Sequence, residues 1–167
     1  YSNGYSQNIV VISSANFVNF VFNSLNVYGS GNPIALYTSS ITNFDFRNNI
    51  VSNPAGGRVL YFNSNSISQA NYNDLYTSGS TFGYYNSTDY SNLAAWKSAS
   101  SRENNSLNLD PNFTSSTDLH SNLSSLDSAC LPISGYTDDI DFETRNTSRA
   151  DIGADEFQSL PDNLGIS

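Results

Sequence analysis

Three tyrosines recur at intervals of 24 residues and are the first candidates for contact with a ligand: Tyr37, Tyr61 and Tyr85. Each lies in a short apolar and aromatic run of the kind that favours a β-strand. If the three runs pair side by side, their tyrosines lie roughly 5 Å apart on one face. Such a row, with nearby serine and asparagine side chains, suits contact with a neutral glycan. The same row also stabilises stacked strands without any ligand, and the sequence leaves both interpretations open.

The densest acidic run contains the candidate metal ligands Asp138, Asp139 and Asp141. Ca²⁺ takes six to eight oxygen ligands from carboxylates and carbonyls, so this run is a candidate calcium site, although it lacks EF-hand spacing. In the alternative, Asp141 and Asp151 cap backbone amides. They would then also pair with Arg145 or Arg149. No other cofactor is implied.

No catalytic constellation is visible in the repeats. Glycan cleavage needs a positioned acid and base, whereas Asp45 and Arg47 share one strand face and Asp74 belongs to a later segment. His120 has no neighbour in sequence that suggests a triad, so we expect a surface histidine. The single Cys130 lies between apolar residues and is expected to be buried. We therefore predict that this stretch of chain is not itself an enzyme.

A 24-residue repeat organises the first half of the chain. Apolar, β-branched and aromatic runs begin at Val10, Ile34, Arg58 and Phe82. A second segment keeps the same step, since Phe20 and Phe22 recur as Phe44 and Phe46. Repetition at such a period predicts stacked units, and the composition of the runs predicts strands within each unit.

Alternation along these strands assigns one column of side chains to the interior: Ile12, Leu36, Leu60 and Tyr84. A polar residue beside an apolar one ends each tier, at Asn26, Asn49 and Asp74. Asparagine enters the left-handed αL conformation readily, and stacked asparagines hydrogen-bond from tier to tier. We therefore predict an all-β fold, a right-handed parallel β-helix with about 24 residues per tier.

The repeat ends after residue 88, which divides the chain into three parts. Residues 1–88 form the predicted tiers, and residues 89–157 form a helix and a C-terminal capping segment of the same domain. The helix is expected over residues 91–100, with Trp96 plugging the open end of the coil. Residues 158–167 are predicted to be a linker and the start of a following module.

The second half of the chain carries motifs in a characteristic order, at residues 72–76, 93–96, 105–113, 127–130, 139–145 and 151–157. The last of these reads DIGADEF. This order resembles the C-terminal end of secreted right-handed parallel β-helix proteins of the choice-of-anchor type, common among Bacteroidetes surface proteins. Phe142 stands where that family usually has glycine. The resemblance implies a structural closure, export to the cell surface and further domains in the same chain.

Composition narrows the class of partner. The 167 residues carry a net charge of −9, with 6 basic residues against 15 acidic ones, so nucleic acid is not an expected partner. No apolar run is long enough for membrane insertion. We predict a non-catalytic terminal section of a secreted or cell-surface protein that contacts neutral glycans or other surface partners in adhesion. The alternative is the C-terminal cap of a polysaccharide lyase or glycoside hydrolase whose active site lies on upstream tiers.

Overall fold

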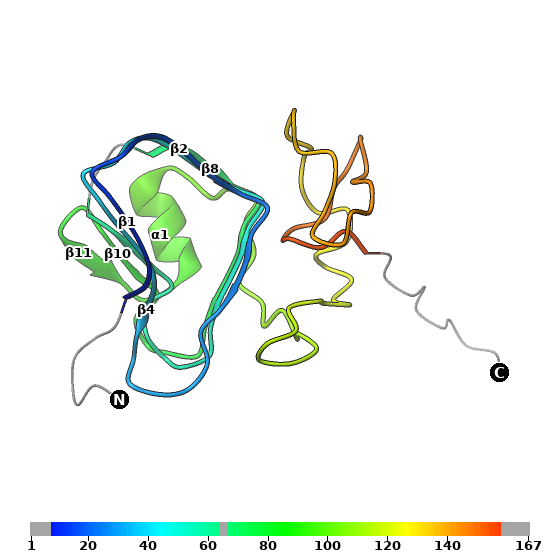
Figure 1. Cartoon of the computed structure of the whole chain (residues 1–167). Coiled ribbons are helices and arrows are strands. Elements are labelled where there is room, and N and C mark those ends of the chain that lie inside the picture. Colours follow the sequence, from blue (N-terminus) through cyan, green and yellow to red (C-terminus); the bar gives the residue numbers. More distant parts are fainter. Residues whose placement is uncertain (1–7, 64–66, 158–167) are drawn as a thin grey trace.

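The computed structural model describes residues 8–63 and 67–157, which form a parallel β-solenoid of about three turns, one short helix and a closing segment (residues 104–157). Viewed along the coil, successive turns lie over one another and the closing segment lies beside them (Figure 1). The predicted fold class, parallel strands stacked at about 24 residues per turn, is confirmed. The predicted linker at residues 158–167 lies outside the described residues.

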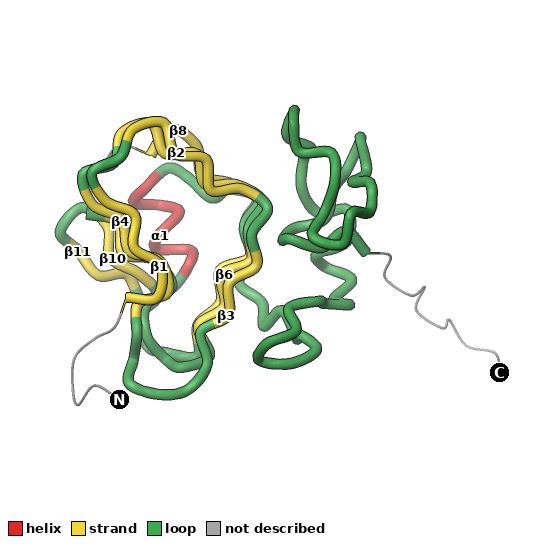
Figure 2. Tube along the Cα trace, viewed as in Figure 1, coloured by secondary structure: helices red, strands yellow, loops and turns green. Residues whose placement is uncertain are grey.

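Three sheets form the walls of the coil (Figure 2). Sheet A contains β1 (Asn8–Ser13), β4 (Ile34–Ser39), β7 (Leu60–Phe62), β10 (Gly83–Tyr85) and β11 (Thr88–Tyr90). Sheet B contains β2 (Asn16–Val21), β5 (Thr42–Arg47) and β8 (Ile67–Asn71). Sheet C contains β3 (Ser24–Asn26), β6 (Ile50–Asn53) and β9 (Asp74–Thr77). All these strands pair in parallel except β11, which folds back against β10.

The step between tiers is not uniform, and this changes the predicted interior column. Val10 pairs with Leu36, a step of 26 residues, Leu36 pairs with Leu60 after 24, and Leu60 pairs with Gly83 after 23. The inward column is therefore Val10, Leu36, Leu60 and Gly83. Ile12 points inward as predicted and packs against the core, but it pairs with Thr38 and not with Leu36. Tyr84 pairs with Tyr61 on the outer face, so the prediction was wrong about the column of Ile12 and about the face of Tyr84.

Aromatic side chains fill the interior because alternate positions of β5 point inward. Phe44 and Phe46 are buried, and their ring centroids lie 5.7 Å from each other and 5.7 Å from that of Phe62. The intervening residues point outward, where the Arg47 guanidinium forms a bidentate ion pair with Asp45 at 2.6 Å. The predicted shared face of this pair is confirmed, and the pair leaves neither charge free.

A ladder of asparagines holds the corner between sheets B and C. The Asn49 Oδ1 atom accepts hydrogen bonds from the backbone N–H and the Nδ2 of Asn23, both at 3.0 Å. Asn73 Oδ1 accepts the same two bonds from Asn49, at 2.9 and 3.0 Å. The predicted ladder exists, but its first member is Asn23, because Asn26 pairs with Ser52 in sheet C. Its third member is Asn73, and Asp74 is its neighbour.

The side chains of Ser106 and Glu103 accept the hydrogen bonds of Asn73, the last asparagine of this ladder. The Asn73 N–H donates to Ser106 Oγ at 2.9 Å, and Asn73 Nδ2 donates to Glu103 Oε2 at 2.9 Å. Glu103 is fully buried, and its Oε1 atom lacks a hydrogen-bond partner within the described residues. Burial raises the pKa of Glu103 to about 7, although the bonds from Ser106 and Asn73 oppose the rise. Burial likewise raises the pKa of neighbouring Asp74 to about 7.

Helix α1 (Leu93–Ser100) covers the C-terminal end of the coil, as predicted for a plug around Trp96. The Asn92 side chain caps the helix by accepting from the Ala95 N–H at 2.9 Å, so the helix begins two residues later than expected. Trp96 is buried edge-on against Phe62, at 5.6 Å between centroids. A Cβ atom at Gly83 would lie 2.8 Å from the Trp96 ring, so this contact requires glycine.

The closing segment packs against the side of the coil rather than over its end. The residue before each ladder asparagine has positive φ, with values of 55°, 60° and 55° at Phe22, Asn48 and Tyr72. Phe22 and Tyr72 thereby join an apolar cluster with residues of the closing segment. Asn48 Nδ2 donates to the Leu131 carbonyl at 2.8 Å, and the Asn48 carbonyl accepts from Gly153 at 3.0 Å. The DIGADEF turn therefore docks on this column of corner residues.

Across the described ranges, no helix is both long and apolar enough to span a membrane.

We predict that Asn49→Ala lowers the free energy of unfolding by about 3 kcal/mol or more, because it leaves several buried hydrogen-bonding groups without partners. The Asn23 backbone N–H loses its acceptor, and the Phe20 carbonyl loses the bond from Asn49 Nδ2. Asn26→Ala is the matched control, since Asn26 is only partly buried and lies outside the ladder. Urea unfolding of both variants measures the difference. Equal losses in the two variants would show that the ladder contributes nothing special.

The buried carboxyl of Glu103 predicts a stability that falls as pH rises. A folded-state pKa of about 7 lies above the ordinary value of 4.5, so the folded protein holds the proton more tightly. The stabilisation is complete below the ordinary value and is lost as pH rises through about 7. We expect Glu103→Gln to be more stable than the parent at pH 8.5 and nearly equal at pH 5, by roughly 1.4 kcal/mol per pKa unit. Part of the pH dependence remains, because Asp74 titrates in the same direction.

Thermal unfolding across this pH range tests the prediction, with the exposed Glu143→Gln as the control. A parent protein whose melting temperature rises from pH 5 to pH 8.5 would contradict it.

Candidate functional site

The tyrosine row exists, but its third member is Tyr84 rather than Tyr85. Ring centroids lie 5.0 Å apart between Tyr37 and Tyr61, and 4.2 Å apart between Tyr61 and Tyr84. Tyr85 faces the other way and packs against Trp96. The 23-residue step into the fourth tier causes this difference.

The rings of the row cover one another. Their interplanar angles are 23° and 11°, so neighbouring faces are stacked and mainly ring edges and hydroxyls remain for solvent. Burial and a hydrogen bond with Tyr84 raise the pKa of the Tyr61 hydroxyl. A sugar ring binds an aromatic side chain through the face, so this arrangement serves the coil better than it serves a ligand.

The three predicted calcium ligands do not converge. Asp139 accepts hydrogen bonds from the backbone N–H groups of Asp141, Glu143 and Glu156, at 2.9, 2.8 and 2.9 Å. Burial favours a higher pKa for Asp139, but these three donors outweigh it and the pKa lies below its ordinary value. Asp139 thus organises its loop. Asp138 is exposed, and its carbonyl accepts from Arg145 Nε at 3.3 Å.

Asp141 instead contacts the one histidine. Its Oδ2 lies 2.7 Å from His120 Nε2, and Asp118 contacts the other ring nitrogen. His120 is on the surface as predicted, but it has two carboxylate partners, one from 21 residues further along the chain. That long separation is why the sequence alone did not show the pair.

The polar residues around the DIGADEF turn serve structure. Asp151 is buried and accepts from the N–H groups of Ser128 and Phe157, at 2.6 and 2.7 Å. Its predicted role as an amide cap is confirmed, whereas the acid that pairs with Arg145 is Glu156, at 3.5 Å. Cys130 is buried as predicted, and burial raises the pKa of its thiol to about 12, which suppresses thiolate chemistry.

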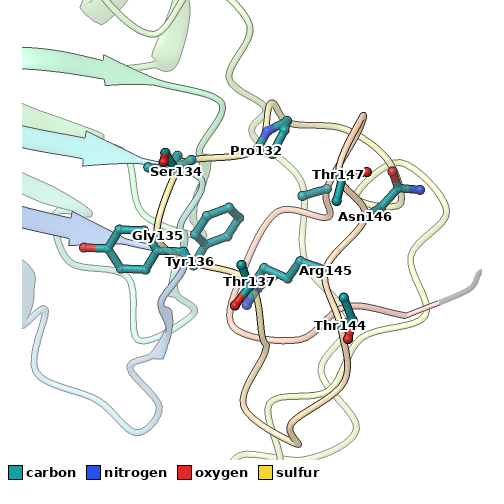
Figure 3. Close-up of a pocket in the computed structure, with 12 residues that line it drawn as sticks. Pro132, Ser134, Gly135, Tyr136, Thr137, Thr144, Arg145, Asn146 and Thr147 are labelled. Carbon is teal, nitrogen blue, oxygen red and sulfur yellow. The ribbon is translucent and has the colours of Figure 1, made fainter.

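A pocket that the sequence did not reveal lies where the closing segment meets the coil. Its volume is about 410 Å³, a size typical of small-molecule sites. Two loops face each other across it, one carrying Ser134–Thr137 and the other Thr144–Thr147 (Figure 3). Phe22 from the coil contributes an aromatic ring, and Tyr136 lies 6.2 Å from it at an angle of 44°.

Arg145 builds this pocket. Its guanidinium carbon lies 4.2 Å from the Phe22 ring centroid, a cation–π contact. Its Nη2 donates to the Ala154 carbonyl at 2.6 Å, and its Nη1 lies 3.5 Å from a Glu156 carboxylate oxygen. The residue is only 5% exposed. These contacts satisfy its charge, so it fixes the two loops rather than attracting an anion.

The remaining lining combines the apolar residues Pro132, Ile133 and Ala150 with neutral hydrogen-bonding groups. The hydroxyl and amide contributors are Ser134, Thr137, Thr144, Asn146 and Thr147. Tyr136 is 39% exposed, so part of its ring is open to a ligand. This chemistry suits a small neutral ligand with many hydroxyls. The sequence matched Phe22 only to Phe46 of the repeat and therefore did not indicate this pocket.

We predict that Arg145→Lys loosens the pocket while the coil stays folded. Lysine cannot reproduce the planar stacking on Phe22 together with bonds to two carbonyls. We expect faster hydrogen exchange over residues 137–157 and unchanged exchange in β4, β5 and β6. Arg149→Lys is the control, because Arg149 is exposed and, among the described residues, its side chain bonds the Ser128 carbonyl alone, at 2.9 Å. Unchanged exchange in the closing segment would contradict the role given to Arg145.

In comparisons with known proteins, no protein-family model matches the chain, and no curated protein or solved structure matches it either.

Proposed function

We propose that this chain is a non-catalytic section of an exported β-helix protein and that it contacts a neutral glycan through the pocket between Phe22 and Tyr136. The observation that carries the proposal is the combination of an open aromatic ring with neutral hydroxyl and amide groups in one cavity. Sugar rings pack their C–H faces on aromatic rings, and their hydroxyls exchange hydrogen bonds with such groups. The one charged residue of the lining, Arg145, is already engaged.

The charges of the coil support a non-catalytic role. Arg58 forms a bidentate pair with Asp89 at 2.8 Å, and Arg47 pairs in the same way with Asp45. Charges locked in such pairs are poorly placed to transfer protons to a substrate. Asp74, the remaining acid of the strands, is buried and accepts from the Leu109 N–H.

Features of the first tier favour the proposal that the coil continues with further turns in a longer protein. The edges of β1, β2 and β3 that face away from β4, β5 and β6 have no strand partner within the described residues. Val11 on this tier is 54% exposed and Phe17 is 76% exposed. Open edges and exposed apolar residues favour pairing with another strand layer. The alternative function, a cap for a lyase or hydrolase with its active site on upstream turns, fits the same observation.

We further propose, from the sequence resemblance, that the protein is exported. The same resemblance suggests a choice-of-anchor relationship and an origin among Bacteroidetes surface proteins. Adhesion follows as the role of a glycan-contacting section without catalytic groups.

A neutral-glycan array tests the pocket. We expect the parent protein to be retained weakly and Tyr136→Ala to lose retention, because the variant removes the open ring. Tyr28→Ala is the matched control, since Tyr28 is 62% exposed and lies outside the pocket. Circular dichroism verifies that both variants remain folded.

Three results would count against the proposal. Absence of retention for the parent protein would overturn glycan contact altogether. Retention that survives Tyr136→Ala but disappears in Tyr84→Ala would move the contact to the tyrosine row. Release of shortened glycan products would favour the enzymatic alternative.

A further inference from the structure

A group of metal-ligand side chains lies in the closing segment, apart from the pocket. His120, Asp141 and Asp155 each offer one ligand atom, and the three atoms lie within 4.8 Å of one another. They come from three separate stretches of a segment whose described residues contain isolated bridges but no helix or extended strand. One ion at this point would therefore connect three loops.

The imidazole of His120 is oriented as a metal ligand usually is. Asp118 contacts Nδ1 and Asp141 lies 2.7 Å from Nε2, so each ring nitrogen faces a carboxylate, and the Nε2 proton shared with Asp141 is the one that a metal ion would displace. A histidine that binds a metal commonly donates its other ring N–H to a carboxylate, which sets the tautomer and raises the basicity of the ligand. Asp118 supplies that second contact here.

The surrounding charge favours a cation. Asp155 is flanked by the like charges of Asp139, Asp141 and Glu143, and among the described residues the charge of His120 opposes them. The Asp139 carboxylate is occupied by three backbone donors. Asp141 and Asp155 are the two acids that share the space beside Nε2.

We propose that His120 Nε2, Asp141 and Asp155 bind one divalent transition-metal ion of the zinc class and that this ion cross-links the closing segment. Imidazole with carboxylate is a donor set that suits zinc and its neighbours, whereas calcium takes oxygen ligands. Two ligands of one tetrahedral zinc lie roughly 3.5 Å apart, so modest rotations of these surface side chains bring the three atoms into place. The ion takes the position of the proton between Nε2 and Asp141, and that proton is released to solvent. The site differs from the predicted calcium ligands in that it includes a nitrogen donor and omits Asp138 and Asp139.

Isothermal titration of the full chain with ZnCl₂ tests the proposal. We expect one ion per chain, with affinity lowered roughly tenfold or more in His120→Ala, Asp141→Asn and Asp155→Asn. Asp118→Asn should weaken binding to a smaller extent, because Asp118 orients His120 without bonding the ion. Glu143→Gln is the matched control, since it removes one nearby exposed carboxylate that is not a ligand.

Cobalt(II) supplies a second readout that does not depend on affinity. We expect visible absorption bands of a low-coordinate cobalt site in the parent protein, and their loss in His120→Ala. Zinc should also raise the melting temperature of the parent protein but not that of His120→Ala, because a ligand that binds the folded state stabilises it.

Absence of zinc binding would reduce the cluster to an ion pair between imidazolium and carboxylates. Equal weakening by Glu143→Gln and Asp155→Asn would show diffuse attraction by an acidic surface rather than a site. Calcium binding that is unchanged in His120→Ala would likewise overturn the assignment. None of these outcomes affects the glycan pocket, whose test uses Tyr136.

Discussion

The turn between sheets B and C is the constraint on which the rest of the structure depends. At this turn the chain must point one side chain inward to join the asparagine ladder, and the preceding residue adopts positive φ to make that possible. Buried amide groups that accept and donate between tiers fix the distance and register of the coil, because a shift of one residue would leave them without partners. At the same turn the preceding side chain points out of the coil, as for Phe22 and Tyr72. One local conformation thus specifies both the stacking of the tiers and the surface on which the closing segment docks.

That outward column explains why the pocket forms where it does. Phe22 presents its ring outside the coil, and Arg145 packs on it while bonding the loop that carries Ala154. The DIGADEF turn reaches the same surface through Gly153, where a Cβ atom would lie 2.6 Å from Ile50. The pocket is therefore bounded on one side by the regular coil and on the other by irregular loops. Coil geometry fixes its aromatic wall, whereas hydrogen bonds of single side chains fix the opposite wall.

The repeat made the fold predictable, and the details that it could not specify are differences of one or two residues. The connection from sheet C back to sheet A shortens with each tier: ten positions separate Asn26 from Leu36, eight separate Ser52 from Leu60, and seven separate Tyr76 from Gly83. Reading a constant step placed Tyr85 where Tyr84 lies and matched Phe22 with Phe46, whereas Phe20 is the residue that pairs with Phe46. Periodicity reports that strands stack, but the register is decided by loop lengths and by buried partners. Contacts such as His120 with Asp141 join residues that share no repeat, so no pattern in the sequence indicates them.

The acidic character of the chain has its cause in the closing segment. Ten of the 15 acidic residues lie in residues 104–157, together with only two basic ones, Arg145 and Arg149. A segment without regular strands must satisfy its backbone N–H groups by other means, and Asp139, Asp151 and Glu156 do so with their carboxylates. Each carboxylate used in this way adds negative charge to a small volume, where like charges repel one another. Arg145 is already engaged by Glu156 and the Ala154 carbonyl, so it does not offset the negative charge of the carboxylates near His120. The use of side chains in place of a strand ladder therefore creates a local need for a cation, and a bound divalent ion meets that need while tying the loops together.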